Sequence, residues 1–212
     1  MKIGMIGSGN VGQQLAIGFV RLGHSVKIGT RDTAKLAEWL SSAGENVSAG
    51  SLTEAAQFGE VLVLATSWGG TLNAIELAGS ENFAGKIVVD VTNPLDFSQG
   101  VPPKLASAPG NSGAEQIQKA IPGAKITKAF NTISAHTMIN PSMQDGDPVL
   151  FIAGDTDAKK FATETATGFG WKSVIDTGDL SQSYLLETFA MLWINYAFAN
   201  NHWTHAFKLL VK

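Results

Sequence analysis

A glycine-rich turn between an apolar run and a helical pattern restricts the fold of this chain more than any other feature. Residues 2–6 form a short, mainly apolar run that suits a buried strand, and residues 7–12 read Gly-Ser-Gly-Asn-Val-Gly. Over residues 13–22, apolar side chains recur at roughly helical spacing. The spacing G-x-G-x-x-G between a strand and a helix is typical of a dinucleotide-binding unit. These residues therefore predict a strand, a tight turn and a helix.

Glycine suits each of the three positions of this turn for a different physical reason. Gly7 lets the chain turn sharply out of the strand, and Gly9 leaves room for a pyrophosphate to approach the backbone. Gly12 lets the helix and the strand pack closely. The free N–H groups and the dipole at the start of the helix favour a bound anion. We therefore predict a dinucleotide at this turn, and the alternative is a glycine-rich turn with a structural role only.

Composition and charge exclude several classes of function. The 212 residues carry a net charge of −3 and contain no cysteine, so disulfides, thiolate catalysis and cysteine-ligated metals are ruled out. A pI of about 5.8 does not suit a nucleic-acid partner. The first strand begins at residue 2, which leaves no room for a signal peptide, and no apolar run has the length of a membrane helix. We therefore expect a soluble, cytoplasmic protein with a small-molecule partner.

The end of the second predicted strand, residues 25–29, indicates which dinucleotide is preferred. Enzymes that use NAD usually place an acidic side chain there, whereas the 2′-phosphate of NADP needs a hydroxyl donor and a cation. Thr30 and Arg31 supply that pair, and Lys35 can add a third contact. The alternative is a solvated turn in which Asp32 caps the following helix. Because Asp32 lies two residues beyond the usual acidic position, the sequence favours NADP(H).

Two further strand ends are expected at the same rim. The run at residues 60–65 reads as a strand buried on both faces, as in a parallel sheet covered by helices. Thr66, Ser67 and Trp68 follow it, so we expect them beside the adenosine or the pyrophosphate, although packing alone could explain Trp68. Asn93 and Pro94 follow the strand at residues 87–91, and we expect them to form the wall near the nicotinamide.

The remaining chain continues the alternation of strand and helix. Strands are expected at residues 125–130, 148–153 and 172–176, and residues 97–110 should form a loop over the crevice. The pattern predicts an α/β fold of the Rossmann type: a doubly wound, mostly parallel sheet in a single domain of residues 1–212, with a C-terminal helical extension from about residue 178 to 212. One broad apolar face is expected on the C-terminal helix, formed by Leu185, Leu186, Phe189, Leu192, Trp193 and Tyr196. That face could be core, cover the crevice or join two copies in a homodimer.

Some patterns carry little weight. Residues 79–86 imitate a phosphate loop, but five residues separate the glycines and Ile87 follows the lysine where Ser or Thr should bind magnesium, so we reject this site. His136 is the one histidine expected near the crevice and could orient or protonate a substrate, although a histidine bonded at the rim is the simpler interpretation. His202 and His205 have no carboxylate beside them, so no metal site is predicted.

Four segments together resemble a known family. They are residues 7–12 (GSGNVG), 30–32 (TRD), 128–138 (KAFNTISAHTM) and 176–187 (DTGDLSQSYLLE). They resemble the NADP oxidoreductases that depend on the deazaflavin coenzyme F420, over nearly the whole chain. They are also similar to the cytosolic oxidoreductase domain of the six-transmembrane metalloreductases, which passes a hydride from NADPH to a flavin.

The resemblance implies a nicotinamide and a deazaflavin lying face to face, with little side-chain chemistry, because hydride transfer relies on proximity and on the cofactors themselves. It implies that the pyrophosphate is held by Gly7, Ser8, Gly9, Asn10 and Val11, the 2′-phosphate by Thr30 and Arg31, and the nicotinamide side by Asn131 and Ile133. Members that use the deazaflavin often carry histidine at the position of Asn131. The hydride partner therefore stays open among coenzyme F420, FMN and FAD.

The sequence as a whole predicts an NADP(H)-dependent oxidoreductase that transfers a hydride between NADPH and a deazaflavin or flavin acceptor. One alternative is an NADPH-dependent reductase of a small imine or ketone. The chain ends before the long helical domain with which such enzymes usually build a substrate site, and this disfavours that alternative. The other is a sensor that binds NADP(H) without turnover.

Overall fold

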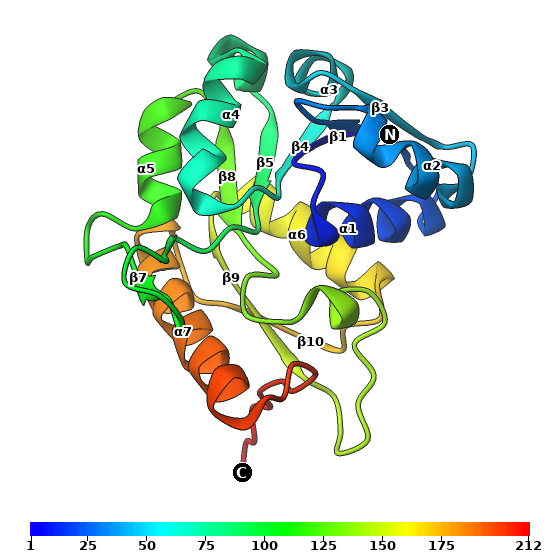
Figure 1. Cartoon of the computed structure of the whole chain (residues 1–212). Helices are drawn as coiled ribbons and strands as arrows, with labels where there is room; N and C mark the ends of the chain where they lie inside the picture. Colours follow the sequence, from blue (N-terminus) through cyan, green and yellow to red (C-terminus); the bar gives the residue numbers. More distant parts are fainter.

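An eight-stranded sheet with helices on both faces organises the computed structural model, which describes residues 1–212 (Figure 1). In sheet order the strands are β10 (Ser173–Asp176), β9 (Val149–Gly154), β8 (Lys125–Lys128), β5 (Ile87–Asp90), β4 (Val61–Leu64), β1 (Lys2–Ile6), β2 (Ser25–Gly29) and β3 (Val47–Gly50). From β3 to β8 all neighbours are parallel. β9 runs antiparallel to β8, and β10 runs parallel to β9. The predicted doubly wound, mostly parallel sheet is confirmed.

Two layers of helices bury the faces of this sheet. One face packs against α1 (Asn10–Arg21), α2 (Ala37–Ala43) and α6 (Thr156–Gly168). The other packs against α3 (Leu52–Phe58), α4 (Thr71–Ala78) and α5 (Gly113–Ala120). Alternation along β4 divides the strand between the layers: Val61 and Val63 belong to the first core, and Leu62 and Leu64 to the second. A strand with both faces buried has to be apolar throughout, which explains the run at this position.

Short elements connect these layers. Five single turns of 3-10 helix are present: η1 (Ala34–Leu36), η2 (Trp68–Gly70), η3 (Ser80–Phe83), η4 (Ala135–Thr137) and η5 (Leu180–Gln182). The predicted loop over residues 97–110 overlaps a small antiparallel hairpin, formed by β6 (Leu95–Asp96) and β7 (Lys104–Leu105). Each of its strands has two residues, which is too short for a periodic pattern to reveal.

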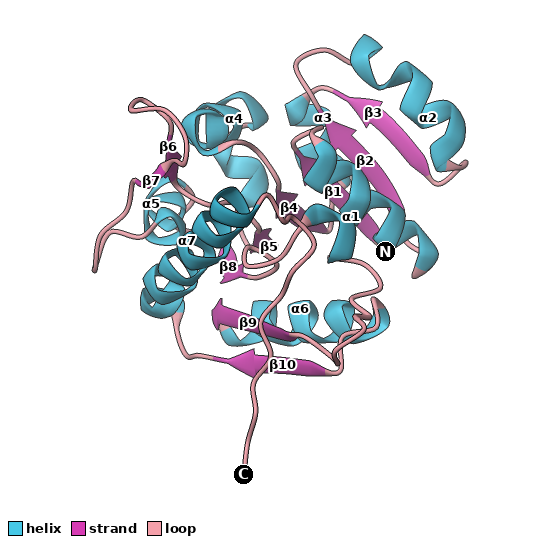
Figure 2. Ribbon diagram, turned by 60° about the horizontal axis from the view of Figure 1, so that its bottom comes forward, coloured by secondary structure: helices cyan, strands magenta, loops and turns pink.

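The C-terminal helix α7 (Ser183–Asn200) lies across the molecule beside α5 and the β6–β7 hairpin (Figure 2). Its buried side carries Leu186, Ala190, Trp193, Ile194 and Ala197, together with Ser183 and Glu187. The predicted single apolar face is wrong in part, because three of its six members point outward: Leu185 is 56% exposed, Leu192 57% and Tyr196 49%. A helix that is apolar on nearly every side does not indicate which side is buried.

Two boundaries differ from the sequence-based expectations. Helix α1 begins at Asn10 rather than at residue 13, so its first turn lies within the glycine motif itself. Helix α4 was not predicted, although Thr71, Ala74, Ile75 and Ala78 are buried at helical spacing. None of the helices combines the length and the apolar composition that a membrane-spanning segment requires.

Candidate functional site

The glycine turn between β1 and α1 has the geometry that the motif predicts. Gly7 has a φ of +124°, and a Cβ on it would lie 2.4 Å from the carbonyl oxygen of Ala65. A Cβ on Gly12 would lie 2.3 Å from the carbonyl oxygen of Gly7. Both positions therefore require glycine for the fold itself. Gly9 differs, because a Cβ on it would meet no atom within 4 Å, so this glycine faces open space.

The N-terminus of α1 has no partner from the protein's own side chains. Its N-cap residue, Gly9, supplies no capping hydrogen bond, and the first turn contains no acidic residue. Helices α3, α5 and α6 differ, because each is capped by a Ser or Asp side chain and carries an acid in its first turn. The free N–H groups and the positive end of the dipole at α1 are what a bound anion requires.

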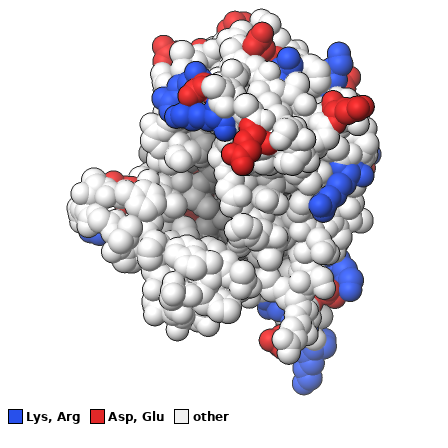
Figure 3. All heavy atoms as spheres, turned by 45° about the vertical axis from the view of Figure 1, so that its right-hand side comes forward, with Lys and Arg blue, Asp and Glu red and all other residues white.

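A first cavity of about 380 Å³ runs from this turn toward the end of β2. Thr30, Arg31, Asp32 and Lys35 line its far end. Asp32 accepts a hydrogen bond from the backbone N–H of Ala34 and lies 3.8 Å from the ammonium of Lys35, so its charge is already directed toward η1. Arg31 and Lys35 carry two positive charges against the single negative charge of Asp32, so this end of the cavity is positive. Figure 3 shows Lys and Arg side chains gathered above a hollow in the surface.

A second cavity of about 630 Å³ extends from the turn in the opposite direction. Trp68 and Phe97 supply aromatic rings to its wall, and Phe97 is 55% exposed. Asp96 is its one titratable side chain. Hydrogen bonds from the backbone N–H and the hydroxyl of Ser98 lower the pKa of Asp96, so this carboxyl is ionised at neutral pH. The cavity thus offers flat apolar surface and no side chain that is a proton donor at pH 7.

The two cavities form one groove along the carboxyl ends of the strands, since Gly9, Ala65, Thr66 and Ser67 line both. The groove brings together twelve of the predicted site residues: Gly7, Ser8, Gly9, Asn10, Val11, Thr30, Arg31, Lys35, Thr66, Ser67, Trp68 and Asn93. Volumes of about 300 to 1,000 Å³ are usual for small-molecule sites. A groove with an anion site at its middle and a cationic far end fits a dinucleotide that carries an additional phosphate.

Five predicted residues, Asn131 among them, do not line this groove. Gly12 is buried under the turn. Pro94 is buried too, and its carbonyl accepts the N–H of Ala106. Ile133 packs in the core on the α1 side of the sheet. His136 is exposed on η4. The roles assigned to Pro94, Ile133 and His136 stay predictions.

Comparison with known proteins identifies the family. Residues 2–94 match the family model described as NADP oxidoreductase, coenzyme F420-dependent. A crystal structure from Arthrobacter sp. FB24, provisionally assigned as an F420-dependent NADP reductase, is 37% identical, covers 100% of both chains and superposes with a TM-score of 0.94. The chain belongs to the coenzyme F420-dependent NADP oxidoreductase family.

Two curated relatives agree with this assignment. The F420-dependent NADP reductase of Methanocaldococcus jannaschii is 28% identical, over 92% of this chain and 91% of the relative. The metalloreductase STEAP3 of Rattus norvegicus is 30% identical over 88% of this chain, but this chain spans only 36% of that relative. Membership makes the protein an NADP-dependent oxidoreductase, with NADP(H) as its cofactor.

Asn131 of this family member lies directly behind the second cavity. Its Nδ2 donates to Asn93 Oδ1 at 2.9 Å and to the carbonyl of Leu186 at 3.1 Å, while Asn93 Nδ2 donates to the Asn131 carbonyl at 2.8 Å. Asn131 is 5% exposed, and its Oδ1 has no hydrogen-bond partner. A buried acceptor without a partner is costly. The hydrogen bonds of Asn131 join α7 to Asn93 in the cavity wall. The buried Oδ1 of Asn131 is left without a partner.

Sequence analysis missed a charged cluster behind the same wall. Lys128 Nζ lies 2.7 Å from Asp90 Oδ2 and 3.1 Å from Glu187 Oε1, and all three side chains are 0% exposed. Burial lowers the pKa of Lys128, but the two carboxylates outweigh burial and raise the pKa above its ordinary value. The signal for this cluster was a charged residue at the end of each of the strands β5 and β8 and a single acid within the apolar helix α7, which a strand or helix pattern alone does not connect.

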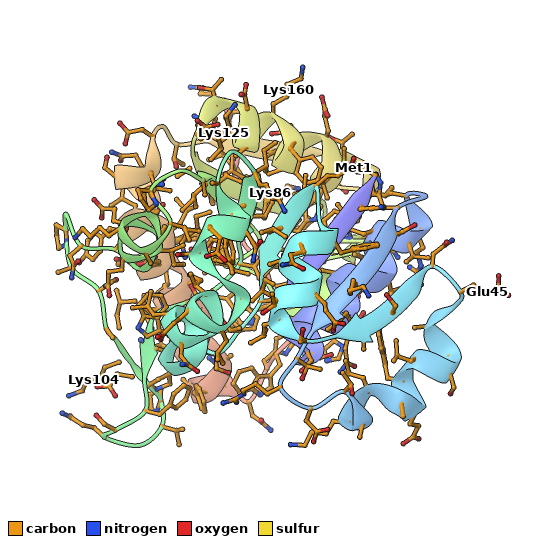
Figure 4. The ribbon with its side chains drawn as sticks, turned by 90° about the horizontal axis from the view of Figure 1, so that it is seen from above. Met1, Glu45, Lys86, Lys104, Lys125 and Lys160 are labelled. Carbon is orange, nitrogen blue, oxygen red and sulfur yellow. The ribbon has the colours of Figure 1, made fainter.

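Neither the rejected phosphate-loop pattern nor the pair His202 and His205 lines the groove. Lys86, from the rejected phosphate-loop pattern, donates to the carbonyl of Ala56 at 2.8 Å. Figure 4 places it with Met1 and Lys125 at the amino-terminal edge of the strands, opposite Lys104. No group of three or more His, Asp or Glu side chains is arranged to hold a metal ion.

Proposed function

We propose that the protein transfers a hydride between NADPH and a deazaflavin or flavin, with the nicotinamide and the acceptor ring in the second cavity. The observation that carries the proposal is the lack of a proton donor in that cavity, where the single titratable group is an ionised Asp96. Reduction of a ketone or an imine adds a proton to oxygen or nitrogen as well as a hydride. A flavin-like ring spreads the added charge over its conjugated system and needs no protein acid.

The shape of the cavity supports the same acceptor class. Trp68 and Phe97 present aromatic surface beside Asn93, and flat rings gain from offset stacking on such side chains. Asn93 Oδ1, which accepts one hydrogen bond from Asn131 Nδ2, has a second lone pair for an N–H of the nicotinamide carboxamide. Gly7 to Val11 would hold the pyrophosphate, and Thr30, Arg31 and Lys35 the 2′-phosphate.

An acceptor screen tests the proposal. Purified protein is mixed with NADPH and, separately, with coenzyme F420, FMN, FAD, a small ketone and a small imine, and loss of NADPH absorbance is followed. We expect oxidation with the deazaflavin or a flavin and none with the carbonyl compounds. Turnover of only the ketone or the imine would refute the proposal. Tight NADPH binding without oxidation by any acceptor would favour the sensor instead.

We also propose that α7 joins two copies of the chain in a homodimer. Leu185, Leu192 and Tyr196 are about half exposed and recur at steps of seven and four residues, which places them on one side of the helix. The exposed part of α7 carries no charged side chain. Light scattering should give the mass of a dimer for the unmodified chain and of a monomer for Leu192→Glu. Thr167→Glu, on α6, is the control and should leave the mass unchanged; a monomeric unmodified chain would refute the dimer.

A further inference from the structure

Buried charged side chains form hydrogen bonds to the turn that follows β5. Val91, Thr92 and Asn93 line the second cavity. The backbone N–H and the hydroxyl of Thr92 both donate to Asp90 Oδ1, at 2.9 and 2.7 Å. The carbonyl of Thr92 accepts from Lys128 Nζ at 2.8 Å. Every polar group of Thr92 is thus bonded within the cluster of Asp90, Lys128 and Glu187.

The same cluster reaches two helices. Glu187, on α7, accepts from the backbone N–H groups of Gly113 and Ala114 at 3.0 and 3.3 Å, so it caps α5 from a distant part of the chain. A Cβ on Gly113 would lie 3.1 Å from the ring of Trp68, which lines the second cavity. The cluster therefore underlies the cavity wall on two sides.

Stability alone is a weak explanation for such a cluster. Taking charged groups out of water costs several kcal/mol per ion, and well-packed apolar side chains often replace buried ion pairs without loss. Here two carboxylates share one ammonium, and the second negative charge is offset by the N–H groups of α5. What apolar replacements could not reproduce is the set of directed hydrogen bonds to Thr92.

We propose that Lys128, held between Asp90 and Glu187, is a positioning residue that fixes the Thr92–Asn93 turn against the nicotinamide. This proposal rests on the proposed function, because it places the nicotinamide in the second cavity. Lys128 itself is fully buried and lines neither cavity. It acts through Thr92, and through Asn93, whose amide is in turn paired with Asn131. Loosening this turn should affect the nicotinamide end of the cofactor and spare the adenosine end.

The experiment compares a whole cofactor with a fragment that lacks the nicotinamide. Binding of NADPH and of adenosine 2′,5′-bisphosphate is measured by calorimetry for the unmodified chain, Lys128→Met and Asp90→Asn. For both variants we expect NADPH to bind about tenfold more weakly, the size of one or two lost hydrogen bonds, and the fragment to bind with unchanged affinity. The emission of bound NADPH should also shift toward that of the free cofactor.

Two features keep the test decisive. Lys128→Met leaves two buried carboxylates without a cation, so if it does not fold, Asp90→Asn carries the test alone, because it keeps the size of the side chain and removes the negative charge that holds Lys128 beside the carbonyl of Thr92. Lys159→Met is the matched control: Lys159 also bonds a carboxylate and a carbonyl, those of Asp176 and Gly178, but it lies away from the groove, and both ligands should bind it normally.

Equal weakening of NADPH and the fragment would overturn the positioning role, because it would indicate a general loss of structure. Unchanged NADPH affinity and emission in a folded variant would overturn it as well. An unmodified chain that binds neither ligand would refute the NADPH site itself, and the role of Lys128 with it, and that result is distinguishable because it needs no variant.

Discussion

Replacing Arg31 by alanine should weaken the binding of NADPH and leave that of NADH almost unchanged. Lys35 is the weaker partner for a phosphate, because its ammonium already lies 3.8 Å from Asp32, whereas the Arg31 guanidinium can bind a phosphate through two N–H groups at once. We therefore expect Arg31 to be the main cation for the 2′-phosphate. A hydrogen bond to a charged group contributes about 1.5 to 3 kcal/mol, which corresponds to a rise in the Kd of NADPH of roughly 10- to 140-fold.

Calorimetric titration of both cofactors measures this difference directly. The control is Lys172→Ala, which removes an exposed cation that is paired with Asp147, away from the groove; neither Kd should change. Because Arg31 is exposed, the difference between NADPH and NADH should also shrink as salt is added. Equal losses of NADPH and NADH affinity in Arg31→Ala would show that this side chain does not recognise the 2′-phosphate.

The remaining predictions concern the glycine turn and the buried cluster. Gly9→Val should abolish binding of both cofactors without lowering Tm, because its side chain would enter open space; normal NADPH binding by this variant would make the turn structural only. Gly12→Ala should cost about 1 to 3 kcal/mol and lower Tm by roughly 2 to 10 °C, because its Cβ would clash with the carbonyl of Gly7; an unchanged melting curve would contradict the geometry. The raised pKa of Lys128 means that its stabilising charge is complete at neutral pH and is lost only as pH rises above the ordinary lysine range. Urea titrations of the unmodified chain should therefore show an alkaline loss of stability that Asp90→Asn reduces, and identical pH profiles for the two proteins would argue against that assignment.

Patterns among neighbouring residues were sufficient to predict most of the sheet. The glycine spacing, the unbroken apolar strands and the Thr30–Arg31 pair each depend on neighbouring residues, and β1, β4 and the cationic end of the first cavity follow from them. Helix α4 also carried its signal in the spacing of its buried residues, from Thr71 to Ala78. Two flanking glycine positions, 70 and 79, obscured that pattern in the sequence.

Contacts between distant segments could not be predicted in this way. Glu187 is the one charged residue of α7, and a sequence pattern would place it in solvent, yet it is fully buried. Its partners come from β8 and from the start of α5, so its burial is decided by tertiary structure. The orientation of α7 follows from that pairing, which explains why Leu185, Leu192 and Tyr196 lie outside.

The shape of the groove has a consequence for how specificity can change. Only Gly9, Ala65, Thr66 and Ser67 line both cavities, and no residue beyond Phe97 lines either of them. Thr30 and Arg31 belong to one end, while Asn93 and Phe97 belong to the other. Under the proposed function, the lining residues that set coenzyme preference and acceptor preference thus belong to separate stretches of the first half of the chain. Selection or design can alter one of these preferences while leaving the other in place.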